Sequence, residues 1–461
     1  MKSTKTRSII VYALSLMFIF GLTVFVFKII YNGSDWATKS INEHISANGT
    51  LSTAGRVLDR NNKTLAQTKD GERIYSKDAL VREAMLQTVG DNTRFISTSV
   101  QNVFKSDLIG YNLVTGIGTN RLIGIGNDIK LTLDSELCKQ TYESFGGRHG
   151  AAVLYNYTTG EILCMVSSPS FDPDDPPNIA DDDTGKYDGV YLNKCISSSF
   201  TPGSIFKIIT CAAAIDNMKD IDTKRFYCNG SLEVGNDEIT CLSKHGDIGF
   251  KEAMSESCNI VFAEIAMDLG VDKMTDEADS MGFNRQFDVD GINISKSIYD
   301  AKSSNLADLG WSGIGQYTDL VNPMYMTMLM GAIANDGVAV KPYMIEQVTT
   351  PIGLPTKVGY GRAMQRMLKV DTAKEIKDIM RYTVKNNYGD SLFSDLTVCA
   401  KTGTAEVGEG KEPHGWMVGF SKDTDCTLAF AVVVENSGYG ISTAGPIAEN
   451  MINTAAKNMR S

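Results

Sequence analysis

The feature that most constrains this chain is an uncharged apolar segment near its beginning. No charged side chain occurs from Ser8 to Phe27. The residues before this segment include Lys2, Lys5 and Arg7. About twenty apolar residues suffice to cross the hydrocarbon core of a membrane as a helix, and a basic flank stays on the cytoplasmic side. The sequence therefore predicts a membrane-spanning helix with a cytoplasmic N-terminus, followed by a large unit folded outside the membrane.

A cleaved signal peptide is the alternative to an anchor. Such a peptide has a shorter apolar stretch and a small-x-small cleavage site directly after it. Here the residues that follow, Lys28 to Asn32, are bulky or charged. We therefore expect an uncleaved, single-pass anchor in the plasma membrane.

The composition limits the classes of protein to which this chain can belong. With 461 residues, 43% of them hydrophobic, it can bury at least one large core. Its net charge of −11 argues against nucleic-acid binding, which depends on clustered Lys and Arg. The nine cysteines are an odd number, and four of them, Cys138, Cys164, Cys195 and Cys211, have apolar neighbours. These four are expected to be small buried side chains rather than a disulfide framework.

Three domains are predicted along the chain. Residues 1–31 form a short cytoplasmic tail and the anchor. Residues 32–127 form a small membrane-proximal, non-catalytic pedestal domain, in which Gly55–Ala66 is typical of two strands joined by a turn at Asn61-Asn62. Leu113–Gly126 is rich in glycine and is expected to form irregular loops. Residues 128–461 form the catalytic domain.

The catalytic domain has the pattern of a sheet with helices packed against it, an α/β (α+β) class. Strand-like runs at Ala151–Tyr155 and Glu161–Val166 predict an antiparallel hairpin. Pro323 begins a methionine-rich helix, whose methionines are expected to fill the core. Three further strands near the C-terminus and a helix from Pro446 to Met459 complete the prediction.

The first chemical motif is Ser204 with Lys207, an S-x-x-K pattern. Residues three apart on a helix share a face, so the amine can reach the hydroxyl. A serine hydroxyl is a weak nucleophile and needs a base, and Lys207 can serve only if burial and a nearby cation lower its pKa. Pro202-Gly203 suits a helix start, which would place Ser204 near free backbone N–H groups.

Two more motifs follow in order. Ser257 and Asn259 lie two apart, so in an extended segment a proton-relaying hydroxyl and a substrate-binding amide point to the same side. The run Lys401-Thr402-Gly403-Thr404 falls where an edge strand is expected. There Lys401 can supply a cation, Gly403 a close backbone approach, and the Thr404 N–H an oxyanion donor.

Each motif alone has a plain explanation. An isolated S-x-x-K is usually a helix cap with a solvated lysine, Ser257 and Asn259 are usually a turn pair, and K-T-G is usually a strand end. The ordered occurrence of all three is what favours an activated serine.

The ordered set resembles the class B penicillin-binding proteins, monofunctional peptidoglycan D,D-transpeptidases, and a short penicillin-binding protein A-like member in particular. Further family motifs are matched at six places: Gly55–Arg60, Ser168–Pro173, Phe200–Lys207, Gly313–Gln316, Lys401–Glu406 and His414–Trp416. One departure is Ile205, where the family commonly has threonine. Only about a hundred residues separate the anchor from the catalytic unit, so no transglycosylase domain is expected.

The resemblance implies a penicillin-binding protein/serine β-lactamase-like fold and acyl transfer through Ser204. Lys207 would take the proton of Ser204, Ser257 would pass it to the leaving amine, and Asn259 would orient the stem peptide. Lys401, Thr402, Gly403 and Thr404 would receive the terminal D-Ala-D-Ala carboxylate. β-Lactam antibiotics would acylate the same serine, and a polytopic glycan polymerase would be the membrane partner.

A possible structural zinc site is formed by Cys228, Cys241, His245 and Cys258. Three sulfurs and an imidazole suit zinc, but the spacings are too long for a zinc-finger signal. Some elongation-type relatives are similar in carrying a metal at the corresponding loop. A Cys228–Cys241 disulfide and separate free thiols stay open as alternatives.

Other functions compete with the transpeptidase. A serine β-lactamase shares the nucleophile and K-T-G, but no deacylating glutamate is evident after Ser257. A β-lactam sensor would need more membrane segments and a cytoplasmic effector. A non-catalytic scaffold for a glycan polymerase would be expected to have lost Ser204, Lys207 or Lys401.

Overall fold

The structure is a computed structural model. It describes residues 2–37, 51, 53–93, 95–110, 126–302, 304–393, 396–408 and 410–460. The loops expected at Leu113–Gly126 lie almost entirely outside the described residues, as does most of the polar stretch after the anchor.

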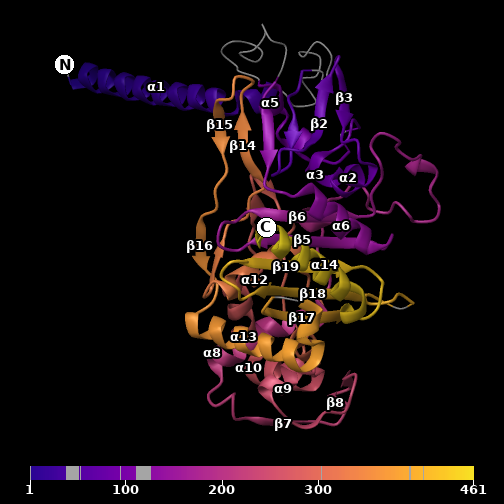
Figure 1. Cartoon of the computed structure of the whole chain (residues 1–461). Coiled ribbons are helices and arrows are strands. Elements are labelled where there is room, and N and C mark those ends of the chain that lie inside the picture. Colours follow the sequence, from indigo (N-terminus) through magenta and orange to yellow (C-terminus); the bar gives the residue numbers. More distant parts are fainter. Residues whose placement is uncertain are drawn as a thin grey trace.

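The first element is the long helix α1, Lys2–Ala37, which projects away from the rest of the chain (Figure 1). Its stretch Thr4–Ile29 is long and apolar enough to cross a membrane, and none of its most apolar window is buried against the protein. A mainly apolar surface left uncovered is stable in lipid and costly in water. The predicted apolar helix is therefore confirmed.

A five-stranded antiparallel sheet forms the centre of the catalytic domain (Figure 1). Its order is β17 (Val398–Ala405), β18 (His414–Ser421), β19 (Leu428–Val434), β5 (Gly150–Asn156) and β6 (Ile162–Ser168). Every residue of β5, β6 and β19 is buried, because helices cover both faces of the sheet. The predicted hairpin is the pair β5–β6.

Helices α6 (Ser135–Phe145), α12 (Pro323–Ala334) and α14 (Gly440–Arg460) pack around this sheet. In α12 the Asn322 side chain caps the N-terminus, and Pro323 occupies the first turn. All of its methionines are buried in the core, as predicted: Met324, Met326, Met328 and Met330. The prediction that the last helix starts at Pro446 is wrong. α14 begins earlier, at Gly440, where the glycine packs closely against the backbone of β18.

A second, six-stranded sheet joins the two predicted domains. Its order is β15 (Pro355–Val358), β14 (Ile345–Thr349), β4 (Asp128–Leu131), β1 (Val57–Leu58), β2 (Thr64–Lys69) and β3 (Glu72–Tyr75). The parallel pair β1–β4 crosses the proposed boundary at residue 127. Buried Asp59 strengthens the junction, since its carboxylate accepts hydrogen bonds from the Lys63 N–H and the Ser135 hydroxyl.

Smaller helices complete the pedestal side: α2 (Ala79–Ala84), α3 (Leu86–Val89), α4 (Val100–Val103) and α5 (Lys105–Ile109). A helical layer lies at the other end of the molecule: α8 (Lys207–Asn217), α9 (Phe250–Ser255), α10 (Asn259–Met281), α11 (Leu306–Ser312) and α13 (Val370–Thr383). Beside it lie a short hairpin, β8 (Ser231–Val234) with β9 (Asp237–Thr240), and a two-stranded sheet of β7 (Arg225–Cys228) and β10 (Gly246–Gly249), which flank that hairpin in sequence (Figure 1).

The remaining short elements connect these layers and the sheets. They are α7 (Lys194–Ser197), β11 (Asp288–Val289), β12 (Ile292–Asn293), β13 (Val338–Val340), β16 (Ala363–Arg366) and the turns Ile179–Asp181 and Asp390–Phe393.

Candidate active site

Ser204 lies in a tight 3-10 turn, Gly203–Phe206, that leads directly into α8. Gly203 has φ +55°, which favours glycine, and a Cβ there would come within 2.4 Å of the Thr404 carbonyl oxygen. The turn can therefore press against β17. The expected helix start is confirmed, and Ser204 lies in its first turn.

Lys207 is the centre of the polar contacts in the site. Its Nζ is fully buried, 3.0 Å from Ser204 Oγ, 2.6 Å from the Ser257 carbonyl oxygen and 2.7 Å from Asn259 Oδ1. Burial lowers the pKa of Lys207 to about 7. A neutral amine has two N–H donors and one lone pair. With the N–H groups on the two carbonyl oxygens, the lone pair is available to the Ser204 hydroxyl.

Ser257 links the two lysines of the site. Its Oγ is 3.2 Å from Lys207 Nζ and 2.9 Å from Lys401 Nζ. Ser257 has φ +56°, an uncommon conformation for a residue with a side chain, and the next residues begin α10. Strained backbone of this kind persists where surrounding contacts hold it in place.

Lys401, Thr402, Gly403 and Thr404 lie on β17, the edge strand of the five-stranded sheet. Lys401 Nζ also donates to the Thr402 carbonyl oxygen at 2.9 Å. Burial, and secondarily the charge of Lys207, lower the pKa of Lys401 well below its ordinary value. A Cβ at Gly403 would come within 2.8 Å of the Pro202 carbonyl oxygen, so the predicted close approach at this glycine is confirmed.

Residues of all three motifs line one groove, a cavity of about 230 Å³, and the buried amines of Lys207 and Lys401 contact the groove residues Ser204 and Ser257. Its polar wall is formed by Ser204, Ser257, Asn259, Thr402 and Thr404. Its rim carries the apolar side chains of Leu242, Trp311, Ile314, Tyr439 and Ile441. The structure thus brings together three motifs that lie far apart in sequence.

Sequence reasoning missed Tyr388 and Thr240. Tyr388 Oη accepts a hydrogen bond from the Thr402 N–H, and the Thr240 carbonyl oxygen accepts one from Asn259 Nδ2 at 2.9 Å. Neither residue belongs to a recognisable pattern, since each reaches the site through tertiary contacts.

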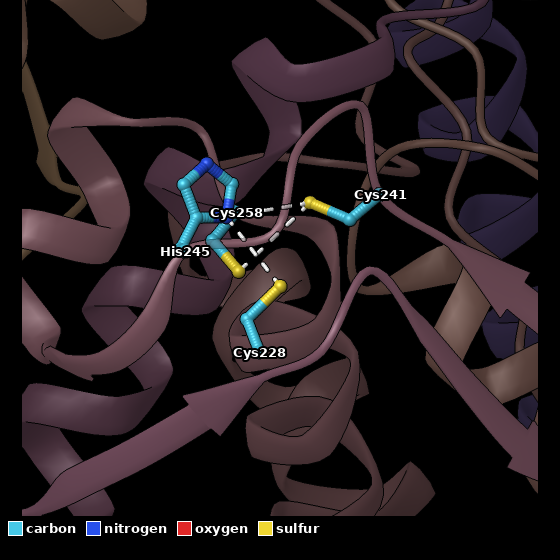
Figure 2. A group of neighbouring side chains, drawn as sticks. All are labelled: Cys228, Cys241, His245 and Cys258. Atoms are coloured by element: carbon cyan, nitrogen blue, oxygen red, sulfur yellow. Dashed lines mark hydrogen bonds between the residues drawn. The ribbon is translucent and has the colours of Figure 1, made fainter.

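The predicted metal ligands form a second cluster (Figure 2), and all nine cysteines are free thiols. The three Sγ atoms and the imidazole nitrogen lie within 4.8 Å of one another. Cys241 Sγ is 4.0 Å from Cys258 Sγ, and His245 Nδ1 is 3.4 Å from Cys228 Sγ. Sulfur atoms around a tetrahedral zinc are about 3.8 Å apart, given Zn–S bonds of about 2.3 Å. The donor set and spacing therefore fit zinc.

The cluster is joined to the groove through the backbone. Cys258 stands between Ser257 and Asn259, and the Asn259 N–H donates to Cys241 Sγ at 3.3 Å. A hydrogen bond between Cys241 and Cys258 lowers the pKa of the Cys241 thiol and raises that of the Cys258 thiol, so the pair shares a proton that a bound zinc ion would displace.

The profile of the family "Penicillin binding protein transpeptidase domain" matches residues 150–453, more than half of the chain. The chain belongs to this family. It is 27% identical over 352 residues to the peptidoglycan D,D-transpeptidase PbpA of Mycolicibacterium smegmatis, covering 69% of this chain and 70% of that one. It is 28% identical over 352 residues to the stage V sporulation protein D of Bacillus subtilis, covering 71% and 53%.

Solved structures share the fold. The D,D-transpeptidase domain of a peptidoglycan glycosyltransferase from Eggerthella lenta superposes with a TM-score of 0.75 at 24% identity, covering 88% of this chain and 98% of that one. A ceftriaxone acyl-enzyme complex of penicillin-binding protein A from M. tuberculosis gives a TM-score of 0.76 at 22% identity, covering 88% and 99%. The predicted fold class is confirmed.

Proposed function

We propose that this chain is a serine-type peptidoglycan D,D-transpeptidase that crosslinks stem peptides and is acylated by β-lactams. The observation that carries the proposal is the contact of one buried amine, Lys207 Nζ, with Ser204, Ser257 and Asn259. The family and the D,D-transpeptidase activity of relatives such as PbpA support the same reaction.

In the acylation step, Lys207 takes the proton of Ser204 as Oγ attacks the carbonyl carbon of the penultimate D-alanine. The N–H groups of Ser204 and Thr404 would stabilise the oxyanion, and Gly203 allows the serine turn to approach β17 closely enough for this role. Ser257, in contact with both lysines, passes the proton to the leaving amine. The peptide bond breaks, terminal D-alanine leaves, and an acyl-serine ester remains.

Substrate is held by the other side of the groove. Lys401, Thr402 and Thr404 receive the terminal carboxylate, a role that suits a cation beside hydroxyl groups. The arriving negative charge favours the charged form of Lys401, which burial otherwise disfavours. Asn259 orients the stem-peptide amide.

In the second step, an amine of a neighbouring stem peptide attacks the ester carbonyl. A new amide bond forms, the Ser204–acyl bond breaks, and the proton of the amine returns through Lys207 to Ser204 Oγ. The product is a crosslink and the regenerated enzyme.

Labelling with a fluorescent penicillin tests the proposal. We expect a persistent adduct on the wild-type chain and none on Ser204→Ala, because β-lactams would acylate the same hydroxyl. Rapid hydrolysis of the drug without a lasting adduct would indicate a β-lactamase. Absence of any adduct on a folded wild-type chain would leave only a non-catalytic scaffold.

We also propose that Cys228, Cys241, His245 and Cys258 hold a structural zinc ion. Zinc would supply a fixed tetrahedral geometry, and the hydrogen bond from the Asn259 N–H to Cys241 would carry that geometry to the groove. Metal analysis of protein purified under reducing conditions tests this. One equivalent of zinc is expected in the wild type and in the control Cys426→Ser, and a strong loss in Cys241→Ser. Absence of zinc from the wild type would reject the site.

For the membrane arrangement, we propose a single-pass plasma-membrane anchor with a cytoplasmic N-terminus and an extracytoplasmic catalytic domain. The exposed apolar surface of α1 and its basic flank support this. Protease added to intact spheroplasts should digest the catalytic domain. Full protection of that domain from the protease would contradict the proposed orientation.

A polytopic glycan polymerase is proposed as the membrane partner, because crosslinking acts on stem peptides carried by the glycan strands that such a polymerase makes. Co-purification in mild detergent of the full chain with such a polymerase tests this. Loss of co-purification is expected when α1 is exchanged for an unrelated membrane helix.

A further inference from the structure

Tyr388 contacts the substrate-binding strand at one point, and no motif marks it. It ends the π-helical turn Val384–Tyr388, which follows α13. Its Oη accepts the Thr402 N–H at 3.0 Å and lies 2.9 Å from Thr402 Oγ1. The N–H and the hydroxyl group of Thr402 therefore converge on one phenolic oxygen.

The contact occurs on the open edge of β17. Because β18 covers the other edge, the N–H of Thr402 faces outward, and so does that of Thr404 two residues on. An outward N–H on an edge strand can pair with any extended peptide that approaches. Tyr388 occupies the Thr402 N–H and leaves the Thr404 N–H as the next donor toward Ser204. It thus fixes where a bound peptide can begin to pair with β17.

The same contact orients a proton. The two hydroxyl groups share one hydrogen bond, and a phenol is a better donor than an aliphatic alcohol. When Tyr388 donates to Thr402 Oγ1, the Thr402 proton is free to point into the groove, which Thr402 lines. A carboxylate can only accept, so a donor aimed at it is what binding requires.

The turn that carries Tyr388 is itself fastened to the opposite wall. Asn387 Nδ2 donates to the Ser255 carbonyl oxygen at 2.7 Å, two residues before Ser257. The position of Tyr388 is therefore fixed relative to both sides of the groove.

We propose that Tyr388 is a positioning residue that caps the Thr402 amide and turns the Thr402 hydroxyl proton toward the terminal carboxylate of a stem peptide or β-lactam. This inference rests on the proposed function, because the carboxylate is that of its substrate.

The test compares Tyr388→Phe with the wild type in stopped-flow acylation by benzylpenicillin and by its methyl ester, which lacks the carboxylate. One neutral hydrogen bond is worth about 0.5–1.5 kcal/mol, so the dissociation constant of the non-covalent penicillin complex should rise about two- to twelvefold. The acylation rate constant should change less, and the ester should show no difference between the two proteins. Tyr382→Phe, on the same helical segment but without a contact to Thr402, is the matched control.

A double-mutant cycle adds an independent readout. Thr402→Val removes the hydroxyl that Tyr388 orients, so Tyr388→Phe should have little further effect in that background. Equal rises in the dissociation constants of benzylpenicillin and its methyl ester would overturn the inference. Fully additive effects of Tyr388→Phe and Thr402→Val would also overturn it. It can fail while the proposed function stands, since adduct formation at Ser204 is measured separately. If Tyr388→Phe does not fold, Thr402→Val alone must still weaken the binding of benzylpenicillin and leave the binding of its methyl ester unchanged.

Discussion

The two walls of the groove are built in different ways. β17 carries Lys401 to Thr404 on a regular strand, held by a continuous ladder to β18. The opposite wall, Ser257 to Asn259, is a bend with one residue at positive φ, and it is held by side-chain contacts to Lys207 and to the Cys/His cluster. The strand wall therefore depends on the fold, whereas the bend wall depends on a few local interactions that can be removed one at a time.

Removing the Lys207 amine, which lies between the two walls, should have the largest effect on acylation. Lys207→Met keeps the buried stem but deletes the base, and general-base contributions are about 10²–10⁴-fold. We expect the second-order rate constant of penicillin acylation to fall about a thousandfold. Lys273→Met, an exposed lysine on α10, is the control and should react as the wild type does. A decrease in this rate constant of less than about tenfold would mean that a group other than Lys207 is the general base.

Removing the proposed zinc ion, which would act on the bend wall, should have the second-largest effect. Mutation of the partners that orient metal ligands typically costs about 10–100-fold in metal affinity or activity, and we expect acylation of metal-stripped protein to fall by a similar factor. Zinc added back should restore it. Cys258→Ser should behave like stripped protein, and Cys426→Ser like the wild type. Unchanged acylation in fully stripped protein would mean that the bend holds its shape without metal.

A substitution on the strand wall should have a smaller effect. Gly403→Ala places a Cβ within 2.8 Å of the Pro202 carbonyl oxygen and 3.0 Å of Ile205 Cγ2, both beside Ser204. Overpacking costs about 1–3 kcal/mol, and a shift of the serine turn should slow acylation about tenfold. The zinc content should stay at the wild-type value, which separates the two walls. Loss of zinc in this variant would show that they are not independent.

The smallest effect is the pH dependence near neutrality. Lys207 acts as a base only when neutral, and burial lowers its pKa to about 7. Acylation should therefore be constant above this pKa and decrease as the pH falls through it, by about fivefold between pH 7 and pH 6. A profile of the acylation rate from pH 5.5 to pH 9 measures this. A rate that keeps rising to pH 9 would indicate a lysine with an ordinary pKa.

The sequence predicted the strand wall better than its surroundings. Lys401 to Thr404 form a run of neighbours, and the helix and hairpin patterns that position them are local. The convergence of Ser204, Ser257 and Lys401 followed from motif order. In the structure Ser204 and Ser257 line one groove, and the buried Lys401 Nζ lies 2.9 Å from Ser257 Oγ.

Contacts between distant segments were not predictable in the same way. The sheet that pairs β4 with both β1 and β14 joins residues far apart in sequence, which periodicity cannot detect. Tyr388 escaped notice because its role depends on a single tertiary contact. The domain boundary at residue 127 stays a prediction, and a shared sheet now runs across it.

The central claim is tested most directly by a crosslinking assay with lipid-linked precursor, the glycan polymerase that uses it, and the full chain in membranes. The account predicts dimeric, crosslinked stem peptides with the wild type, together with release of D-alanine, and neither product with Ser204→Ala. Crosslinks that persist at wild-type yield in the Ser204→Ala reaction would contradict it.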